Sequence, residues 1–157
     1  MTSELVHLGI KLYGRFHEVD RGISDDLMFI KEMMVKAVHL GNMRIVGETS
    51  HKFSPRGVSV GLLLEDSHLN IHTWPEYGYA DVDLHSCGND SKPDTSMTYV
   101  ISTLNPQAGR VERSYTGILE RSSRGLYLPP KSPPTIMIYS LADYGKFVEN
   151  LKEQSRV

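Results

Sequence analysis

Strict alternation of apolar and polar side chains in the middle of the chain is the feature that most constrains its fold. In the segment that begins at residue 79, Ala80, Val82 and Leu84 alternate with Asp81, Asp83 and His85. This period of two is that of a β-strand with one buried and one exposed face. A sheet that contains such a strand needs a covering layer on its apolar face only, which favours an antiparallel sheet backed by helices.

Other short segments share this strand character. Residues 43–46, 57–64 and 67–72 precede the alternating segment, and residues 5–12 supply an earlier strand. Strands that follow one another closely along the chain favour antiparallel pairing. We therefore expect one mainly antiparallel sheet.

A helix is expected between the first strand and the others. Ser24 is a suitable N-cap, and Asp25 and Asp26 complement the positive end of the helix dipole. Gly41 ends the pattern. Apolar side chains recur between them at helical spacing: Leu27, Ile30, Met34, Ala37 and Val38.

A second helix follows the alternating segment. Pro93 and Asp94 open it, and Asn105 and Pro106 end it. Its apolar positions are Met97, Val100, Ile101 and Leu104. The order of strand, helix, several strands, helix and strand predicts an α+β fold, a two-layer sandwich with a mainly antiparallel sheet and the helices on one face.

The C-terminal part of the chain has a different character. Residues 110–114 have strand character, and residues 121–134 have a loop composition rich in Ser, Gly, Pro and basic residues. Residues 135–139 then suggest a short strand, followed by an amphipathic helix with apolar positions Leu141, Tyr144, Phe147, Val148 and Leu151. We expect a main domain over residues 1–120 and a C-terminal extension over residues 121–157.

Charge and hydropathy exclude several classes of partner. The 17 basic and 19 acidic residues give a net charge of −2, so we expect no nucleic acid and no membrane surface as partner. Apolar runs such as residues 60–64 are far shorter than the roughly 18 residues of a membrane span, and the opening residues lack the apolar core of a signal peptide. We expect a cytoplasmic protein whose single cysteine, Cys87, forms no intrachain disulfide.

Residues 65–88 hold the densest cluster of reactive groups: three of the seven histidines, the only Trp and the only Cys. His68 with His72, and His85 with Cys87, are ligand types suited to zinc. However, residues four apart on a strand lie too far apart to chelate one ion without a bend, and we expect no metal site. A Ser-His-acid hydrolase is also disfavoured, because Ser67 lacks the Gly-x-Ser-x-Gly turn of such nucleophiles.

Two sequence runs together indicate a family. The first is Ser67-His68-Leu69, Ile71-His72-Thr73-Trp74-Pro75-Glu76-Tyr77-Gly78-Tyr79-Ala80, then Asp83 and Cys87-Gly88, and the second is His51-Lys52-Phe53-Ser54-Pro55-Arg56-Gly57-Val58-Ser59. In this order and spacing they resemble the processing and active-site region of the prokaryotic S-adenosylmethionine decarboxylase proenzymes. The resemblance covers residues 51–88 closely and residues 1–50 and 89–115 more loosely.

The resemblance implies that the chain makes its own cofactor. The hydroxyl of Ser67 would attack the carbonyl of Asp66, and elimination of the resulting ester followed by hydrolysis would leave a pyruvoyl group derived from Ser67. The resemblance assigns removal of the serine α-proton to His72, since a neutral imidazole is a suitable base at pH 7. It assigns to Ser59 the polarisation of the carbonyl during processing.

The resemblance also implies a substrate and a biological role. The pyruvoyl ketone would form a Schiff base with S-adenosylmethionine and release carbon dioxide, with Cys87 as proton donor to the α-carbon. Phe53 would stack on the adenine, and Glu76 would bind the ribose hydroxyls. The product is the aminopropyl donor of polyamine (spermidine) synthesis, and members of the family act as homodimers of cleaved αβ protomers.

The chain departs from the family pattern at a few positions. Asp66 stands where a Glu commonly precedes the cleaved serine, Val60 follows Ser59 where a Gly is common, and Lys11 and Arg15 replace a His and an acid. These changes leave open a pyruvoyl-dependent arginine or ornithine decarboxylase on the same fold. They also leave open an uncleaved regulatory or binding subunit without catalysis.

Overall fold

The alternating segment is strand β6 (Tyr79–Ser86), the central strand of a seven-stranded sheet with the order β10-β7-β2-β6-β5-β4-β3. All six neighbouring pairs are antiparallel. The computed structural model describes residues 4–122, 124–130 and 135–156. The other strands of this sheet are β2 (Gly9–His17), β3 (Ile45–Lys52), β4 (Val58–Leu64), β5 (His68–Trp74), β7 (Ala108–Thr116) and β10 (Ile136–Ser140).

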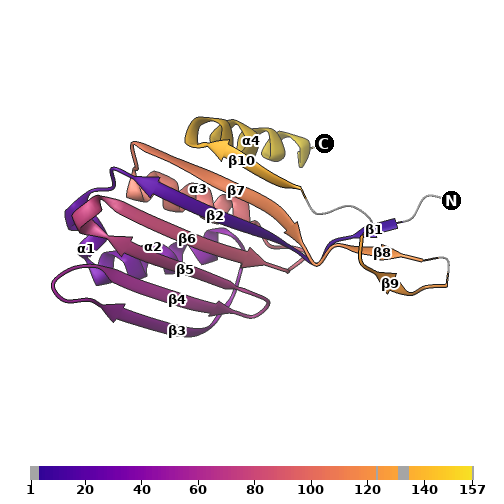
Figure 1. Ribbon diagram of the computed structural model, residues 1–157, viewed down its shortest axis with the longest axis horizontal. Helices are drawn as coiled ribbons and strands as arrows, with labels where there is room; N and C mark the ends of the chain where they lie inside the picture. Colours follow the sequence, from indigo (N-terminus) through magenta and orange to yellow (C-terminus); the bar gives the residue numbers. More distant parts are fainter. Residues whose placement is uncertain (1–3, 123, 131–134, 157) are drawn as a thin grey trace.

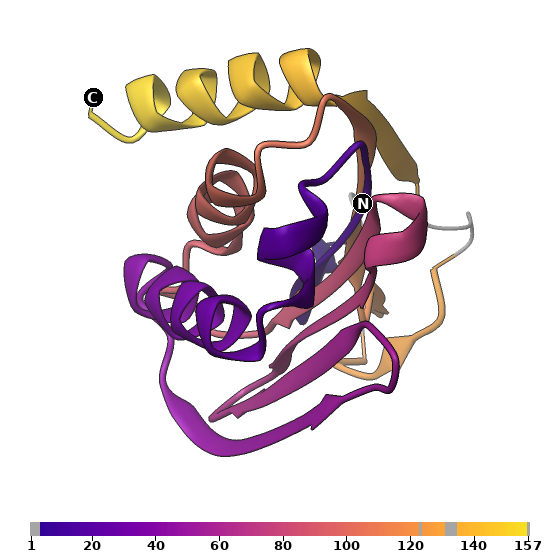
Figure 2. The same cartoon turned by 90° about the vertical axis from the view of Figure 1, so that its left-hand side faces the viewer.

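Helices cover one face of this sheet and leave the other uncovered (Figures 1 and 2). The longer helices are α2 (Leu27–Leu40), α3 (Pro93–Leu104) and α4 (Leu141–Gln154), and the shorter ones are α1 (Arg21–Asp25) and the 3-10 helix η1 (Pro75–Tyr77). The core fills the space between the two layers, and its largest buried side chains include Leu12, Phe16, Ile30, Met34, Leu69, Ile71, Leu84 and Met97. The α+β two-layer prediction is confirmed. We call the uncovered side of the sheet the open face.

A small three-stranded sheet extends beyond one end of the main sheet. It consists of β1 (Glu4–Val6), β8 (Leu119–Arg121) and β9 (Tyr127–Leu128), in the order β1-β8-β9. The β1–β8 pairing continues the β2–β7 pairing in the same antiparallel sense, and the two strands bend away from the body of the molecule (Figure 1). The sequence did not predict this small sheet, since its strands are only two or three residues long.

The first helix was predicted with the wrong cap. Asp26, not Ser24, is the N-cap of α2, and its carboxylate accepts a hydrogen bond from the backbone N–H of Phe29 at 3.0 Å. Ser24 is buried within the separate short helix α1, which Asp20 caps. The end of α2 at Gly41 and the full extent of α3 agree with the prediction.

Several strands are longer than the sequence predicted. The first strand continues to His17, and β3 reaches Lys52 although strand character was recognised only over residues 43–46. β3 is an edge strand in which most side chains are exposed. A strand without a buried face carries little alternation, and its pairing is set by the neighbouring strand.

The predicted C-terminal extension packs against the same core. β10 pairs with β7, and Tyr144 and Val148 of α4 are buried. A buried network joins α4 to the main sheet: Arg113 of β7 donates two bonds from Nε and one from Nη2 to the carboxylate of Asp94, at 3.1–3.3 Å, and the Tyr144 hydroxyl donates to Asp94 Oδ1 at 2.7 Å. A domain division at residue 120 stays a prediction.

This network predicts a measurable loss of stability on removing one hydroxyl. Tyr144→Phe keeps the ring but leaves a buried carboxylate oxygen with one donor fewer, so we expect the free energy of unfolding to fall by about 1–2 kcal/mol. Urea denaturation followed by circular dichroism measures it. Tyr127→Phe, at an exposed position, is the matched control, and an equal effect of the two substitutions would contradict the role given to the network.

Candidate active site

The tight turn between β4 and β5 presents the proposed cleavage bond. Leu64 N–H donates to Ser67 O at 2.8 Å and Ser67 N–H donates to Leu64 O at 3.3 Å, so these residues close a loop with Glu65 and Asp66 at its exposed tip. Ser67 lies immediately before β5, whereas the sequence predicted it as the first residue of a strand over residues 67–72. The bond between Asp66 and Ser67 is therefore accessible and lies outside the main strand pairing.

The end of β6 holds the Ser67 side chain in place. The backbone N–H of Cys87 donates to Ser67 Oγ at 2.9 Å. The register brings the two residues close, because His68 pairs with His85, so that Ser67 lies opposite Ser86 and Cys87 is the residue that follows. A cavity of about 190 Å³ lies beside it, lined in part by Asp66, Ser67 and Gly88. The structure thus brings together three of the residues predicted for processing and catalysis.

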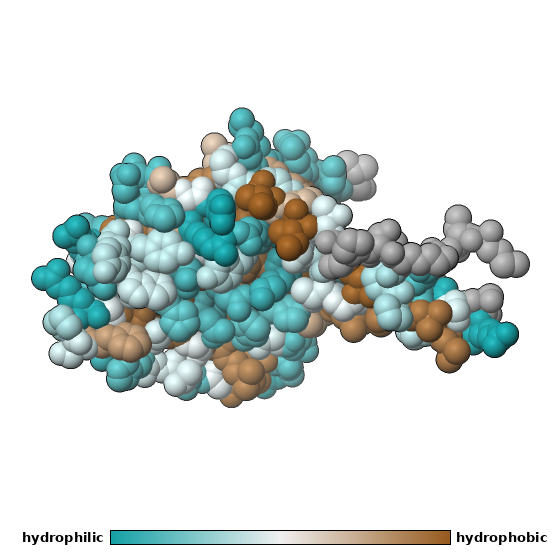
Figure 3. Space-filling view, viewed as in Figure 1, coloured by the Kyte–Doolittle hydropathy of each residue, from teal (hydrophilic) through white to brown (hydrophobic). Residues whose placement is uncertain are grey.

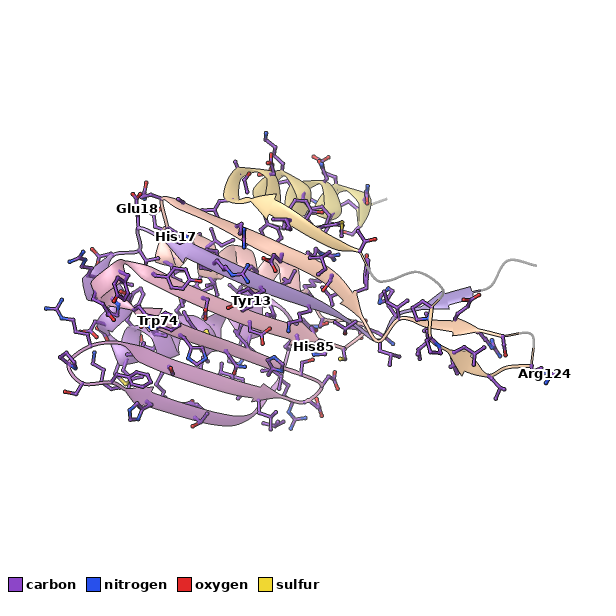
Figure 4. The ribbon with its side chains drawn as sticks, viewed as in Figure 1. Tyr13, His17, Glu18, Trp74, His85 and Arg124 are labelled. Atoms are coloured by element: carbon purple, nitrogen blue, oxygen red, sulfur yellow. The ribbon has the colours of Figure 1, made fainter. Side chains whose placement is uncertain are left out.

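A group of titratable side chains lies next to Cys87 on the open face. His85 Nε2 is 3.5 Å from Cys87 Sγ and 2.8 Å from Thr116 Oγ1. Burial lowers the pKa of His85, and the neighbouring His68 and Lys11 lower it further. The imidazole is therefore neutral at pH 7. Its position is marked in Figure 4.

Asp83 links two of these neighbours of His85. His68 Nε2 lies 3.2 Å from one oxygen of Asp83, and Lys11 Nζ lies 3.7 Å from the other. Within the described ranges 4–122, 124–130 and 135–156, no three His, Cys, Asp or Glu side chains are arranged to hold a metal ion. The sequence indicated His85 only as a possible metal ligand; its place two residues before Cys87 was the available signal for a different role.

The other predicted processing pair lies at the opposite end of β5. Ser59 Oγ is 2.7 Å from His72 Nδ1, because the two residues face each other across β4 and β5. His72 is exposed, and its ring lies 6.2 Å from that of Trp74. Trp74 and His85 are well separated along the sheet in Figure 4.

The two predicted substrate contacts are at the His72 end. Phe53 follows β3 and is 46% exposed, with its ring 4.6 Å from that of His51. A Cβ built on Gly57 would lie 3.8 Å from both the Phe53 ring and Pro75, which places Phe53 near the start of η1. Glu76 is exposed within η1.

The predicted site residues therefore lie in two separate groups on one chain. Ser67 and His72 are five residues apart on an extended strand, or roughly 16 Å at about 3.3 Å per residue. Asp66, Ser67 and Cys87 form one group, which we call the serine end. The other, which we call the histidine end, contains Ser59, His72, Phe53 and Glu76.

Between the two ends the open face is mainly polar (Figure 3). Tyr13 donates a hydrogen bond to Asp81 at 2.9 Å, and burial together with this bond raises the pKa of Tyr13 to about 12. Arg15 forms an ion pair with Glu112. Apolar side chains border this polar centre: Ile136 and Ile138 of β10 and Leu63 of β4 are each more than half exposed.

Comparison with known proteins gives one consistent family. The family model described as S-adenosylmethionine decarboxylase matches residues 10–116. The chain is 45% identical over 97 residues to an S-adenosylmethionine decarboxylase proenzyme of Thermotoga maritima, covering 62% of this chain and 75% of the relative. It is 36% identical over 126 residues to the proenzyme of Thermosipho africanus, covering 80% of this chain and 94% of the relative.

A solved structure shares the fold. The adenosylmethionine decarboxylase of Aquifex aeolicus VF5 superposes with a TM-score of 0.70 at 34% identity, covering 74% of this chain and 97% of that one. In the part of the chain that the structure describes, no helix has the length and hydropathy needed to cross a membrane.

Strand β2 approaches the serine end closely at Gly9, and this close packing predicts the effect of adding a side chain there. A Cβ added at Gly9 would lie 2.7 Å from Ser86 O and 3.0 Å from Cys87 Sγ. We therefore expect Gly9→Ala to lower the free energy of unfolding by about 1–3 kcal/mol through overpacking.

Gly145→Ala is the matched control for this prediction. Nothing lies within 4 Å of a Cβ at Gly145, which is in α4, so we expect this change to raise the stability by about 0.5–1 kcal/mol. Both variants are measured by urea denaturation. Equal stability of Gly9→Ala and the parent protein would show that the serine end is not as closely packed as the structure has it.

Proposed function

The chain belongs to the S-adenosylmethionine decarboxylase family, and on that premise we propose that it cleaves itself before Ser67 and then decarboxylates S-adenosylmethionine. Its product would supply the aminopropyl group for spermidine synthesis. The observation that carries the proposal is the contact of Ser67 Oγ with the Cys87 backbone in an exposed turn. It joins the nucleophile of processing to the residue proposed as proton donor in catalysis.

The surrounding strands suit a chain that is cut at this turn. β4 is paired with β3 on one side and β5 with β6 on the other, and β4 and β5 pair with each other from Ser59 and His72 to Leu63 and His68. Breaking one peptide bond between them leaves all of these ladders in place. The two cleavage products therefore stay associated in one folded unit.

The serine end supplies the groups that the chemistry needs. Ser67 Oγ attacks the carbonyl carbon of Asp66 and converts the amide into an ester, and the Cys87 N–H restrains the hydroxyl beforehand. The pyruvoyl group derived from Ser67 would accept the electron pair released with carbon dioxide. Cys87, whose backbone N–H contacts Ser67 Oγ, would supply its thiol as the proton donor.

The histidine end has to come from a second copy. His72 is roughly 16 Å from Ser67 of its own chain at about 3.3 Å per residue, so it does not reach that α-proton. In a two-fold dimer the same patch of each copy faces the other, and the serine end of one chain meets the histidine end of its partner. Among the described residues, the open face is the face of the seven-stranded sheet that the helices leave free, and its apolar border of Leu63, Ile136 and Ile138 suits such contact.

The same pairing completes the substrate site. Phe53 offers an exposed aromatic face for adenine and the sulfonium cation, and Glu76 offers a carboxylate for the ribose hydroxyls. The two residues of β2 that differ from the family pattern form ion pairs within the chain: Lys11 with Asp83 and Arg15 with Glu112. This favours S-adenosylmethionine over arginine or ornithine as substrate.

Intact mass measurement tests self-cleavage directly. We expect the purified protein to yield two chains, residues 1–66 and residues 67–157, the second blocked at its N-terminus by pyruvoyl. Ser67→Ala should remain one chain, and Ser102→Ala, on the exposed side of α3, should cleave like the parent. Carbon dioxide release from S-adenosylmethionine, arginine and ornithine then identifies the substrate. A parent protein that stays one chain would overturn the proposal and favour an uncleaved binding subunit.

Mixing two inactive variants tests the shared site. A Ser67→Ala copy keeps His72, and a His72→Ala copy keeps Ser67, so only a mixed dimer joins the intact groups. Coexpression in equal amounts should lead to cleavage of about half of the His72→Ala chains, the share that random pairing puts in mixed dimers. His72→Ala expressed alone should stay intact. Cleavage of His72→Ala alone would show that the partner's histidine is not required.

A further inference from the structure

Decarboxylation sets a requirement that Cys87 alone does not meet. Replacing a carboxylate by hydrogen consumes one proton in each turnover. When the Cys87 thiol gives its proton to the substrate carbon, a thiolate remains, and a second donor has to restore the thiol before the next turnover. A group in contact with the sulfur and able to exchange protons near pH 7 is suited to this task.

We propose that His85 is a positioning residue that holds the Cys87 sulfur and returns a proton to it after each turnover. The inference rests on the proposed function, because Cys87 is a proton donor only in that reaction. It gives His85 a role in that reaction, whereas the sequence suggested His85 only as a possible metal ligand.

The contacts of a single ring nitrogen carry the proposal. His85 Nε2 lies 3.5 Å from Cys87 Sγ, within hydrogen-bond range for sulfur, and 2.8 Å from Thr116 Oγ1. The Thr116 hydroxyl can donate or accept. It donates to Nε2 when that nitrogen carries no proton, and it accepts when Nε2 is protonated. Nε2 carries at most one proton, and it has a partner in either state. Without the proton it accepts from the Thr116 hydroxyl. With the proton it donates to Thr116 Oγ1, or to the Cys87 sulfur instead when that sulfur is a thiolate.

Close packing fixes this geometry. A Cβ added at Gly9 of β2 would lie 3.0 Å from Cys87 Sγ and 3.1 Å from His85 Nε2. Only a residue without a side chain allows β2 to approach the pair so closely. The backbone of β2 thus covers one side of the pair and limits the directions in which the two side chains can turn.

The charges that face His85 come from three strands. His68 of β5 and Lys11 of β2 lie opposite it in register, Asp83 is two residues away on β6, and the neutral Thr116 lies on β7. Burial is the largest cause that lowers the pKa of His85, and His68 and Lys11 act in the same direction against Asp83. A lowered pKa keeps the ring neutral at rest and makes its protonated form a ready donor to a thiolate.

The proton balance closes without another reagent. The bond between the substrate carbon and its carboxylate breaks and carbon dioxide leaves, while the S–H proton of Cys87 forms the new C–H bond. The neutral His85 ring then takes up a proton from solvent and gives its Nε2 proton to the thiolate, which returns the ring to its neutral resting state. The sum is one carboxylate and one proton converted into one C–H bond and carbon dioxide.

Alkylation of Cys87 tests the contact without the cofactor. Cys87 is the only cysteine, so iodoacetamide consumption in the uncleaved Ser67→Ala protein reports on that sulfur alone. We expect His85→Phe to slow alkylation about tenfold at pH 7, because a thiolate deprived of a charge-assisted hydrogen bond forms less often. His85→Gln keeps an N–H donor and should stay within about threefold of the parent.

His17→Phe is the matched control for this measurement. His17 is on the same face of the sheet at the other end of β2, with its ring 5.0 Å from that of Tyr79, and its position is labelled in Figure 4. The substitution should leave the alkylation rate unchanged. Alkylation of His85→Phe at the parent rate would overturn the proposed contact.

The turnover number of the cleaved enzyme distinguishes a role of His85 in proton return from a role in packing alone. His85→Gln keeps a hydrogen bond but does not titrate near pH 7, so we expect kcat to fall at least about tenfold with KM little changed, and the pH dependence of kcat to flatten. A merely structural role would leave the shape of that profile as in the parent. An unchanged kcat profile in His85→Gln would overturn proton return by His85, even if His85→Phe does not fold.

The alkylation and turnover measurements distinguish a failure of the proposed role of His85 from a failure of the proposed function. If the parent protein neither cleaves nor releases carbon dioxide, the proposed function fails, and proton return by His85 fails with it. The alkylation rates then still decide whether His85 controls the reactivity of Cys87. If the parent cleaves and turns over while both His85 variants behave as the parent does, only the inference about His85 fails.

Discussion

The arrangement of the molecule depends on covering only one face of an antiparallel sheet. Strand alternation sends Leu69, Ile71 and Leu84 into the layer beneath the helices, where burial of apolar surface stabilises the fold. The same alternation sends the intervening polar residues to the open face. Strand register then determines which of these polar side chains become neighbours, and so which of them can react together. His68 opposite His85 and Ser59 opposite His72 are the two consequences that matter for the site.

Local sequence signals predicted the elements that follow a regular rule. β6 and α3 were recognised because their apolar residues repeat at the period of a strand and of a helix, and Pro93 and Asn105 define the ends of α3. Ser24 was a wrong cap because α1 was not recognised: its single turn is too short to show a period. The full length of β3 was missed for a related reason, since an edge strand in a polar setting has no buried face to produce alternation. Pairing with β4 determines it, and pairing is not local information.

The sequence suggested candidate site residues but not their arrangement in space. Ser67 and His72 are close in the sequence, yet an extended strand places them far apart, whereas Ser67 and Cys87 are twenty residues apart and touch. Proximity along the chain is thus a poor guide to proximity in a sheet. The place of His85 beside Cys87 depends on the approach of Gly9 and on the position of Thr116. Both come from strands distant in the sequence.

The division into a serine end and a histidine end ties processing to assembly. A nucleophile in an exposed turn on a folded monomer is held ready by the Cys87 N–H, but in the proposed arrangement the base that completes processing arrives only with a partner chain. A single copy would therefore remain uncleaved, and the cofactor would form only in a dimer that also brings Phe53 and Glu76 to the same place. Because β4 and β5 are paired with each other and with β3 and β6, cleavage at the turn would leave the sheet intact, and the surface that assembles the proposed dimer before processing would also hold it afterwards.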